Sequence, residues 1–312
     1  MKIIVTGAAG FVGSHLCDKL LQSGHEVIGI DAMVRDELQV IGLRNLESAM
    51  RHPSFHYRPD NLLAIPWETV LPEADVVYHL AGIPGVRSSW GTDFGHYVSN
   101  NINATQRLLE ACKGTALKKL VFVSTSSVYG ETLGKVSESA MPSPLSPYGV
   151  SKLTGEQLCR VYARNEGIPV VILRYFTVYG PRQRSDMAFH RFIRQILLNR
   201  PITIYGDGYQ TRDFTYVGDC AEATAAVAEA EHVIGETINI GGKERASVRD
   251  VIALLERLTG KHAKLVRIGG LKGEPMHTWA DIAKAERLLG YAPKVGLAEG
   301  LREEIAYMQK LL

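Results

Sequence analysis

Residues 2–31, KIIVTGAAGFVGSHLCDKLLQSGHEVIGID, decide the fold of this chain. Lys2–Thr6 is a short apolar run rich in β-branched residues, which predicts a buried strand. Glycines follow at once, and apolar residues then recur at helical spacing until Gly24. A second strand-like run, EVIGI, ends in Asp31. The order of strand, glycines, helix, strand and acid is typical of a dinucleotide-binding βαβ unit.

Each glycine of this unit has a physical role. Gly7 permits the tight turn from strand to helix, and Gly10 lets the backbone approach a pyrophosphate. Gly13 lets the helix lie close to the sheet. The first helical residues, among them Phe11 and Val12, present free N–H groups to the anion.

Asp31 indicates which dinucleotide is bound. A carboxylate there can accept hydrogen bonds from a ribose diol and repels a 2′-phosphate, which favours NAD over NADP. Arg35 follows closely and weakens that preference. The alternative is a structural turn without a ligand, since glycine-rich turns also occur in ordinary loops, but the complete order of elements favours the nucleotide site.

Composition limits the remaining classes of function. The chain has 312 residues, 46% hydrophobic and 22% charged, as expected of a soluble globular protein with one large or two closely joined domains. A formal net charge of +2 gives no indication of a nucleic-acid partner or an anionic membrane surface. We find no apolar stretch as long as a membrane span and no signal peptide before the first strand.

The cysteines point to a reducing compartment. Cys17, Cys112, Cys159 and Cys220 show neither CxxC nor zinc-ligand spacing. We therefore predict reduced thiols, no metal site and a cytoplasmic location.

Strand and helix patterns alternate up to about residue 176. We predict strands at 54–57, 74–82, 118–127 and 168–176, and helices at 38–50, 97–112 and 148–165. This alternation predicts an α/β protein with a Rossmann-like, doubly wound parallel sheet covered by helices on both faces.

The character of the chain changes after Tyr179. A basic loop, GPRQRSD, leads into helices at 187–200, 218–231, 247–258, 281–289 and 297–309, with strands at 236–240 and 264–268. We predict a smaller, discontinuous α/β substrate domain at the carboxyl edge of the sheet, where ligands of open α/β sheets bind. The expected division is 1–175 plus about 213–238 for the NAD-binding domain, and about 176–212 plus 239–312 for the substrate domain.

A second stretch carries candidate chemistry. Ser124 and Thr125 end a predicted strand, and Tyr148 and Lys152 share one face of the next helix. An ammonium beside a phenol favours the phenolate and lowers its pKa. A hydroxyl of Ser124 or Thr125 could hold the substrate oxygen, so the set could act as a general base that oxidises an alcohol. The alternative is an i,i+4 surface pair, but its place after a strand tipped with hydroxyls favours catalysis.

Seven motifs together resemble one family across nearly the whole chain. TGAAGFVGSHL, HLAG, STSSVYG, SPYGVSK, LRYFTVYGPR, GDGYQTRDFTYVGD and NIGG are similar to the extended short-chain dehydrogenases/reductases that act as nucleotide-sugar epimerases and dehydratases. Within it, PGVRSSW, STSSVYG and FTVYGPRQRSDMAFHRFI most resemble bacterial UDP-glucuronic acid 4-epimerases. The resemblance implies NAD-dependent interconversion of UDP-glucuronic and UDP-galacturonic acid through a 4-keto intermediate. It also implies a homodimer formed by the helices near 97–113 and 148–166.

The resemblance assigns roles to further residues. Those implied at the cofactor, besides the glycine turn and Asp31, are Asn61 and Leu62 beside adenine, Leu80, Ala81 and Gly82 in the crevice, Asn101 as a buried support, and Ser124, Tyr148, Lys152 and Tyr175. Those implied at the UDP-sugar are Arg212 at the diphosphate, Glu274 at the uridine ribose, and Thr125, Ser126, Ser127, Tyr148, Thr177, Arg184, Arg191 and Arg87 around the sugar. The family usually has Asp where Asn61 stands, which weakens that assignment.

At two places the sequence differs from the pattern of related enzymes, and these differences reduce the number of reactions expected of it. Ser126 and Ser127 stand where dehydratases and decarboxylases of the family place acids, so dehydration lacks its proton-transfer groups. Thr177 stands where hexose epimerases commonly have Asn, and small hydroxyls can donate to a sugar carboxylate without adding charge. We expect Arg184, and Arg87 as a second partner, to pair with that carboxylate. The alternatives are a UDP-glucose/UDP-galactose 4-epimerase, another nucleotide-sugar dehydratase, decarboxylase or reductase, and a non-catalytic NAD sensor.

Overall fold

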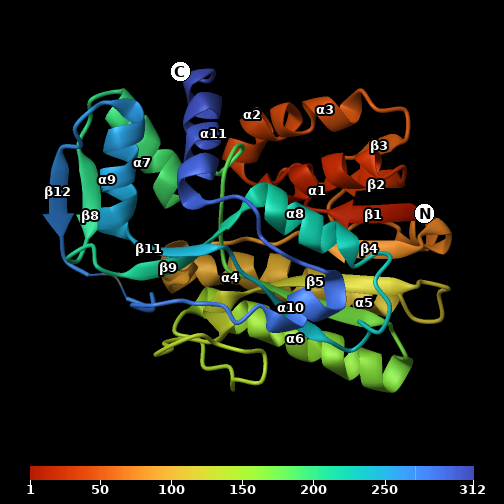
Figure 1. Ribbon diagram of the computed structural model, residues 1–312. Helices are drawn as coiled ribbons and strands as arrows, with labels where there is room; N and C mark the ends of the chain where they lie inside the picture. The colour runs from red at the N-terminus through yellow and green to blue at the C-terminus, as the bar shows by residue number, and fades with distance from the viewer. Residues whose placement is uncertain (271) are drawn as a thin grey trace.

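A seven-stranded parallel sheet forms the centre of the protein (Figure 1). The computed structural model describes residues 1–270 and 272–312. The strands, in spatial order, are β10 (Thr237–Ile240), β6 (Val170–Tyr175), β5 (Lys119–Thr125), β4 (Val76–His79), β1 (Lys2–Thr6), β2 (Glu26–Ile30) and β3 (Phe55–Arg58). The chain reverses direction across the sheet between β1 and β4, which confirms the predicted Rossmann-like, doubly wound α/β fold.

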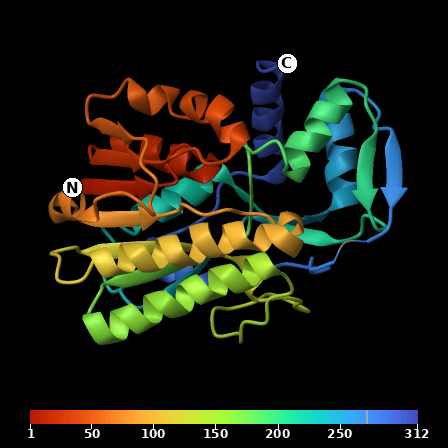
Figure 2. The same cartoon turned by 180° about the vertical axis from the view of Figure 1, so that it is seen from behind.

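Helices cover both faces of this sheet, which explains why its strands are nearly continuous apolar runs. One face lies under α1 (Phe11–Gln22), α2 (Asp36–Asn45), α3 (Glu47–Met50), α8 (Val217–Ala226) and α10 (Ala283–Leu289). The other face lies under α5 (Ala104–Ala111) and α6 (Pro147–Glu166), which run side by side in Figure 2. Short 3₁₀ turns connect these layers: η1 (Trp67–Thr69), η2 (Leu71–Glu73), η3 (Arg87–Ser89), η4 (Gly91–Asp93) and η6 (Ser126–Val128).

A smaller α/β unit has an apolar core of its own. Its elements are β7 (Thr177–Tyr179), α7 (Ala188–Leu197), β8 (Ile202–Tyr205), β9 (Thr211–Tyr216), β11 (Glu244–Ser247), α9 (Val248–Thr259), β12 (Leu265–Ile268) and α11 (Leu297–Gln309). β11, β9 and β7 form one sheet, and β12 pairs with β8. Because β10 completes the central sheet and α10 lies against it, the chain crosses repeatedly between the two units, and the limits of the two domains stay a prediction.

Hydrogen bonds to the side chains of Ser146 and Ser247 explain where α6 and α9 begin. The Ser146 hydroxyl accepts the N–H of Gly149 at 3.1 Å and caps α6, with Pro147 at the first helical position. Ser247 and Asp250 form a reciprocal capping box at the start of α9.

The predicted helix at 97–112 is not a continuous α-helix. It consists of α4 (Phe94–Tyr97), a π-helical segment η5 (Val98–Asn103) and α5. Its physical reason lies outside the helix: Asn101 donates to the carbonyl of Ile83 at 3.0 Å and accepts the Ile83 N–H at 2.7 Å. π segments of this kind are frequent at functional sites.

Other predicted boundaries also shift. The stretch 38–50 divides into α2 and α3, and α8 ends at Ala226. None of the helices within residues 1–270 and 272–312 is both long and apolar enough to cross a membrane. The four cysteines are buried free thiols.

Candidate active site

A cavity of about 400 Å³ opens at the carboxyl ends of the central strands. It brings together most of the residues singled out from the sequence. The lining includes Gly7, Gly10, Phe11, Val12, Gly13, Asp31, Asn61, Leu62, Leu80, Ala81, Gly82, Ser124, Thr125, Ser126, Ser127, Tyr148, Lys152, Tyr175, Thr177 and Arg184. Arg87, Asn101, Arg191, Arg212 and Glu274 lie outside that lining.

The backbone packs so closely around the glycine turn that no Cβ atom fits at Gly7 or Gly13. Gly7 has φ +74°, and a Cβ there would lie 2.8 Å from the amide nitrogen of Ala81. A Cβ on Gly13 would lie 2.1 Å from the Gly7 carbonyl oxygen. The turn therefore tolerates no side chain at either position, and it leaves the first turn of α1 facing the cavity.

Asp31 is held at the rim by backbone donors. Its carboxylate accepts the N–H groups of Ala9 at 3.0 Å and Met33 at 2.8 Å. Burial raises the pKa of Asp31, and these N–H groups oppose that shift. A carboxylate oxygen can accept more than one hydrogen bond, so both retain capacity for a ribose diol.

The base candidates lie at the start of α6. Burial raises the pKa of Tyr148, while a hydrogen bond with Thr125 and the positive charge of Arg184 oppose that rise. Lys152 lines the same cavity as Tyr148, and its expected effect on the pKa of that phenol stays a prediction. The Lys152 ammonium lies 4.3 Å from the centre of the Phe122 ring, and burial lowers its own pKa to about 8.

Of the two hydroxyls left open by the sequence, Thr125 faces the base. The Ser124 hydroxyl donates instead to the Glu156 carboxylate at 2.6 Å. That carboxylate forms a two-point ion pair with Arg174, at 2.9 and 2.6 Å, and both side chains are buried. Ser124 lines the cavity, but its hydroxyl is engaged by Glu156, so the geometry favours Thr125 as the hydroxyl that meets the substrate oxygen.

Glu156 and Arg174 lie outside the cavity lining but hold Ser124, and the sequence reasoning missed them. Glu156 stands one helical turn beyond Lys152, and Arg174 interrupts the apolar run VVILRY. A charge inside a buried strand requires a buried partner, and that requirement was the available signal.

A group of hydroxyls lies beside the base. The Thr125 hydroxyl donates to the Ser127 hydroxyl at 3.3 Å and accepts the Ser127 N–H at 3.1 Å. Arg184 lies at the same cavity and binds Asp186 through two nitrogens, each at 3.0 Å. The arginine is only 17% exposed, so this part of the cavity combines neutral donors with one oriented cation.

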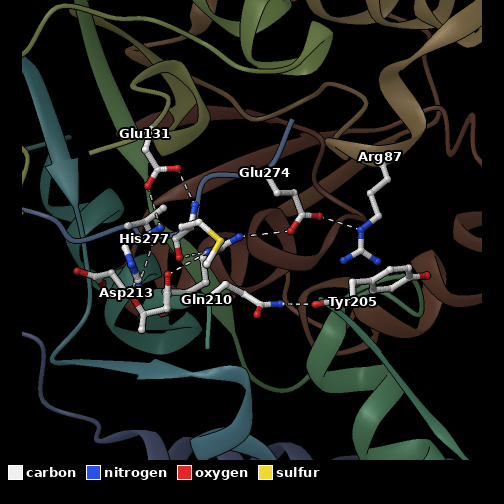
Figure 3. A network of polar contacts seen from close by, with 11 residues as sticks. Arg87, Glu131, Tyr205, Gln210, Asp213, Glu274 and His277 are labelled. Carbon is white, nitrogen blue, oxygen red and sulfur yellow. Dashed lines mark hydrogen bonds and ion pairs between the residues drawn. The ribbon is translucent and has the colours of Figure 1, made fainter. Parts of the chain in front are cut away.

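A second polar cluster contains three other predicted substrate residues, Arg87, Arg212 and Glu274 (Figure 3). Glu274 accepts from Arg87 at 2.8 Å and from Arg212 at 3.3 Å. The Arg87 guanidinium also stacks on the Tyr205 ring, 4.2 Å from its centre. Arg87, expected as a second partner of the sugar carboxylate, lies outside the cavity lining and with Glu274 and Arg212, so that role stays a prediction.

Three further predicted residues have other surroundings. Asn101 is buried and, besides Ile83, donates to the Ser151 hydroxyl at 3.0 Å, so it supports the cavity wall from behind. Tyr175 belongs to the cavity lining, and its hydroxyl forms a hydrogen bond with the hydroxyl of Thr224 at 2.6 Å. Arg191 lies within α7.

Residues 3–241 match the model of the NAD dependent epimerase/dehydratase family. The chain belongs to this family. The match spans the glycine turn, the Tyr148–Lys152 pair and all strands of the central sheet but the first residue of β1.

Relatives within the epimerase/dehydratase family cover the full chain. A Bacillus subtilis protein described as an uncharacterised UDP-glucose epimerase is 55% identical over 100% of this chain and 99% of its own. A UDP-glucuronate 4-epimerase of Thermodesulfobacterium geofontis is 37% identical over 98% and 96%. The crystal structure of a UDP-glucuronic acid 4-epimerase from Bacillus cereus, in complex with UDP-glucuronic acid and NAD, matches with TM-score 0.98, 54% identity and complete coverage of both chains.

Proposed function

We propose that this protein is an NAD-dependent 4-epimerase that interconverts UDP-glucuronic acid and UDP-galacturonic acid. The observation that carries the proposal is one cavity that joins the glycine turn, the Tyr148 base and the hydroxyls beside Arg184. The likeness to the Bacillus cereus enzyme supports the same substrate.

The nucleotide site fits NAD by its shape and charge. Close packing at Gly7 and Gly13 leaves the N-terminus of α1 open to a pyrophosphate, and Asp31 suits an unphosphorylated ribose. Asn61 and Leu62 would flank adenine, Leu80 to Gly82 would line the crevice, and Lys152 would bind the nicotinamide ribose. Asn101 and Tyr175 would hold that crevice in shape.

The chain supplies the proton chemistry of the reaction. When bound, NAD would supply the acceptor, and later the donor, of the hydrogen and electron pair exchanged at C-4 of the sugar. The Tyr148 phenolate takes the proton of the C-4 hydroxyl as the C=O bond forms, and Thr125 holds that oxygen. On return, Tyr148 gives the proton back to the new alcohol, so neither protons nor electrons are consumed.

The UDP-sugar would extend from this cavity to the second cluster. Arg212 and Arg87 suit the diphosphate, because planar guanidinium groups match phosphate oxygens, and Glu274 suits the uridine ribose. Ser126, Ser127, Thr177 and Arg184 would bind the sugar carboxylate, as expected from their neutral donors and single cation. Arg191, in α7, would act only through the smaller unit.

Incubation of the purified protein with UDP-glucuronate tests the proposal. We expect UDP-galacturonate by NMR without accumulation of NADH, because the hydrogen removed is returned. Bound NAD should be released only when the protein is denatured. Stoichiometric NADH, or no turnover of UDP-glucuronate, would contradict the closed redox cycle.

The same assay with UDP-glucose separates the main alternative. The name of the Bacillus subtilis relative favours a UDP-glucose epimerase, whereas Arg184 beside the hydroxyls favours a uronate. A decarboxylase would release carbon dioxide, and a sensor would turn over neither sugar. A higher kcat/KM for UDP-glucose than for UDP-glucuronate would favour the alternative.

Ser127→Ala and Thr177→Ala should raise the fraction of decarboxylated product. Oxidation at C-4 makes a ketone β to the C-6 carboxylate, and such acids lose carbon dioxide when the breaking bond aligns with the carbonyl π system. We expect the hydroxyls to hold the carboxylate out of that alignment. The measurement is the ratio of UDP-pentose or UDP-4-keto-pentose to UDP-galacturonate by NMR, with Ser139→Ala, an exposed serine of a surface loop, as control. Slower turnover at an unchanged ratio would place the restraint elsewhere.

We further propose a cytoplasmic homodimer formed through the helices near 97–113 and 148–166, which include α5 and α6. These helices lie side by side, and Val161 on α6 is 54% exposed. Light scattering gives the mass of the assembly, and a monomer at micromolar concentration would exclude the dimer.

A further inference from the structure

The loop between β7 and α7, residues 180–187, carries Arg184 and is fastened from several sides. The N–H of Gly180 donates to the buried Glu304 carboxylate of α11 at 3.0 Å. The Gln183 side chain is also buried and accepts the N–H of His190 at 2.9 Å. The loop is therefore tied to the smaller unit on both sides of residues 181 and 182.

Residues 181 and 182 are instead held by α1, the helix of the glycine turn. The His15 side chain donates through Nε2 to the carbonyl of Pro181 at 2.9 Å. Arg182 forms an ion pair with Asp18 at 2.8 Å, and these two side chains are 18% and 16% exposed. His15 and Asp18 are three residues apart and so lie on one face of α1. We call these two contacts the α1 clamp.

Two features accompany the clamp. Arg182 has φ +67°, a left-handed backbone conformation that a non-glycine residue adopts only when its surroundings compensate. Burial, with a smaller contribution from the charge of Arg182, lowers the pKa of His15 to about 4. His15 is therefore neutral near pH 7, and its proton sits on Nε2, where the Pro181 carbonyl accepts it.

The same helix contacts the nucleotide side of the cavity. Phe11 lines the cavity and meets the His15 ring edge-on, with ring centres 6.1 Å apart. Arg184 lines the cavity two residues beyond Arg182. Helix α1 thus holds the nucleotide turn at its first residues and the arginine loop one turn later.

We propose that His15, Asp18 and Arg182 are positioning residues that fix Arg184 against the nucleotide-binding helix and so determine affinity for the sugar carboxylate. This inference rests on the proposed function and deepens it. Guanidinium recognition of a carboxylate is directional, and small displacements of a binding group lose much of its effect. Loosening the clamp should therefore weaken recognition of the uronate and leave the proton chemistry at Tyr148 intact.

Asp18→Asn removes the charge of the clamp and preserves the size of the side chain. We expect KM for UDP-glucuronate to rise roughly tenfold, with kcat within about twofold. UDP-glucose, which has no carboxylate, should show less than a twofold change in kcat/KM. Arg182→Gln should behave alike, and the double variant should be no worse than either single one, because all three lack the same ion pair.

Calorimetry measures the affinities for UDP-glucuronate and for UDP separately. A merely structural role of Asp18 would not weaken the first and spare the second. Asp18→Asn should weaken binding of UDP-glucuronate but leave binding of UDP unchanged, with the same NAD content as the unaltered protein. The matched control is Glu47→Gln, which removes one carboxylate from the exposed Arg51–Glu47 pair on α3 and should change none of these values.

The outcomes separate the inference from the proposed function. If the unaltered protein fails to epimerise UDP-glucuronate, the proposed function is wrong. If it does epimerise, an unchanged KM in Asp18→Asn overturns the inference. Equal losses on both sugars, or weaker UDP binding, would also overturn it, since the clamp would then serve the fold as a whole.

Discussion

Tyr148→Phe should reduce turnover roughly 10²- to 10⁴-fold while the protein keeps its NAD. The substitution removes only the oxygen that accepts the proton of the C-4 hydroxyl, and the ring continues to fill the cavity wall. The measurements are kcat for UDP-glucuronate and the NAD content of the denatured protein. Turnover close to that of the unaltered protein would exclude Tyr148 as the essential base.

A matched control is available on the same helix. Tyr162→Phe makes the same chemical change at a tyrosine whose hydroxyl interacts with Gln106 and Glu110, and its kcat should be unaltered. The pH dependence gives a second check. Burial raises the pKa of Tyr148, and the base is active only when deprotonated, so kcat should rise with pH until that group is ionised. If kcat of Tyr148→Phe no longer rises with pH, the rise in the unaltered protein is due to ionisation of the Tyr148 phenol.

Arg184→Ala should lower kcat/KM for UDP-glucuronate far more than for UDP-glucose. A hydrogen bond to a charged group contributes about 1.5–3 kcal/mol, which corresponds to roughly 10- to 150-fold. The hydroxymethyl group of glucose lacks the charge that this arginine would pair with. Both substrates are compared at one pH and the loss is taken as the ratio of their kcat/KM values, because removal of the Arg184 charge also changes the pKa of Tyr148 and does so for both substrates.

Loss of Arg184 also removes the two hydrogen bonds that Asp186 accepts from it. The double variant Arg184→Ala/Asp186→Asn separates lost attraction from new repulsion, since it removes both charges. The kcat/KM of Arg184→Lys for UDP-glucuronate should lie between those of the unaltered protein and Arg184→Ala, because lysine keeps the charge but not the planar fork. Equal losses on both sugars would mean that Arg184 serves the fold or the diphosphate.

Much of this architecture could be predicted from local pattern. The strand at Lys2–Thr6, the turn at Gly7 and the helix after Gly10 lie where the sequence placed them, because apolar runs and glycines act over short distances. The cavity also brings Tyr148 and Thr125 together, as predicted. Thr125 is the last residue of β5, and Tyr148 lies in the first turn of α6, the next long helix of the chain.

What escaped prediction depends on contacts between distant residues. The π segment at Val98–Asn103 follows from the bonds of Asn101 to Ile83, and no periodicity reports such a contact. The choice of Thr125 over Ser124 depends on Glu156, thirty-two positions beyond Ser124. The pairing of Arg87 with Glu274 was not predicted, because Glu274 comes from a segment far along the chain.

The place of β10 in the central sheet has a consequence for synthesis on the ribosome. When Tyr175 has emerged, six of the seven parallel strands exist, but β6 still lacks its neighbour β10. The apolar side of α1 also waits for α8, which supplies buried residues such as Cys220 and Val217. Exposed strand edges and uncovered apolar helices are the features through which nascent chains aggregate.

The central sheet therefore cannot be completed before part of the smaller unit has been synthesised. Its last strand is made only after β8 and β9 of the smaller unit, so both units complete their folding after Ile240 leaves the exit tunnel. Cellular yield should then depend on how long chaperones shield this unfinished sheet during translation, and a pause in translation between residues 176 and 236 would lengthen that exposure.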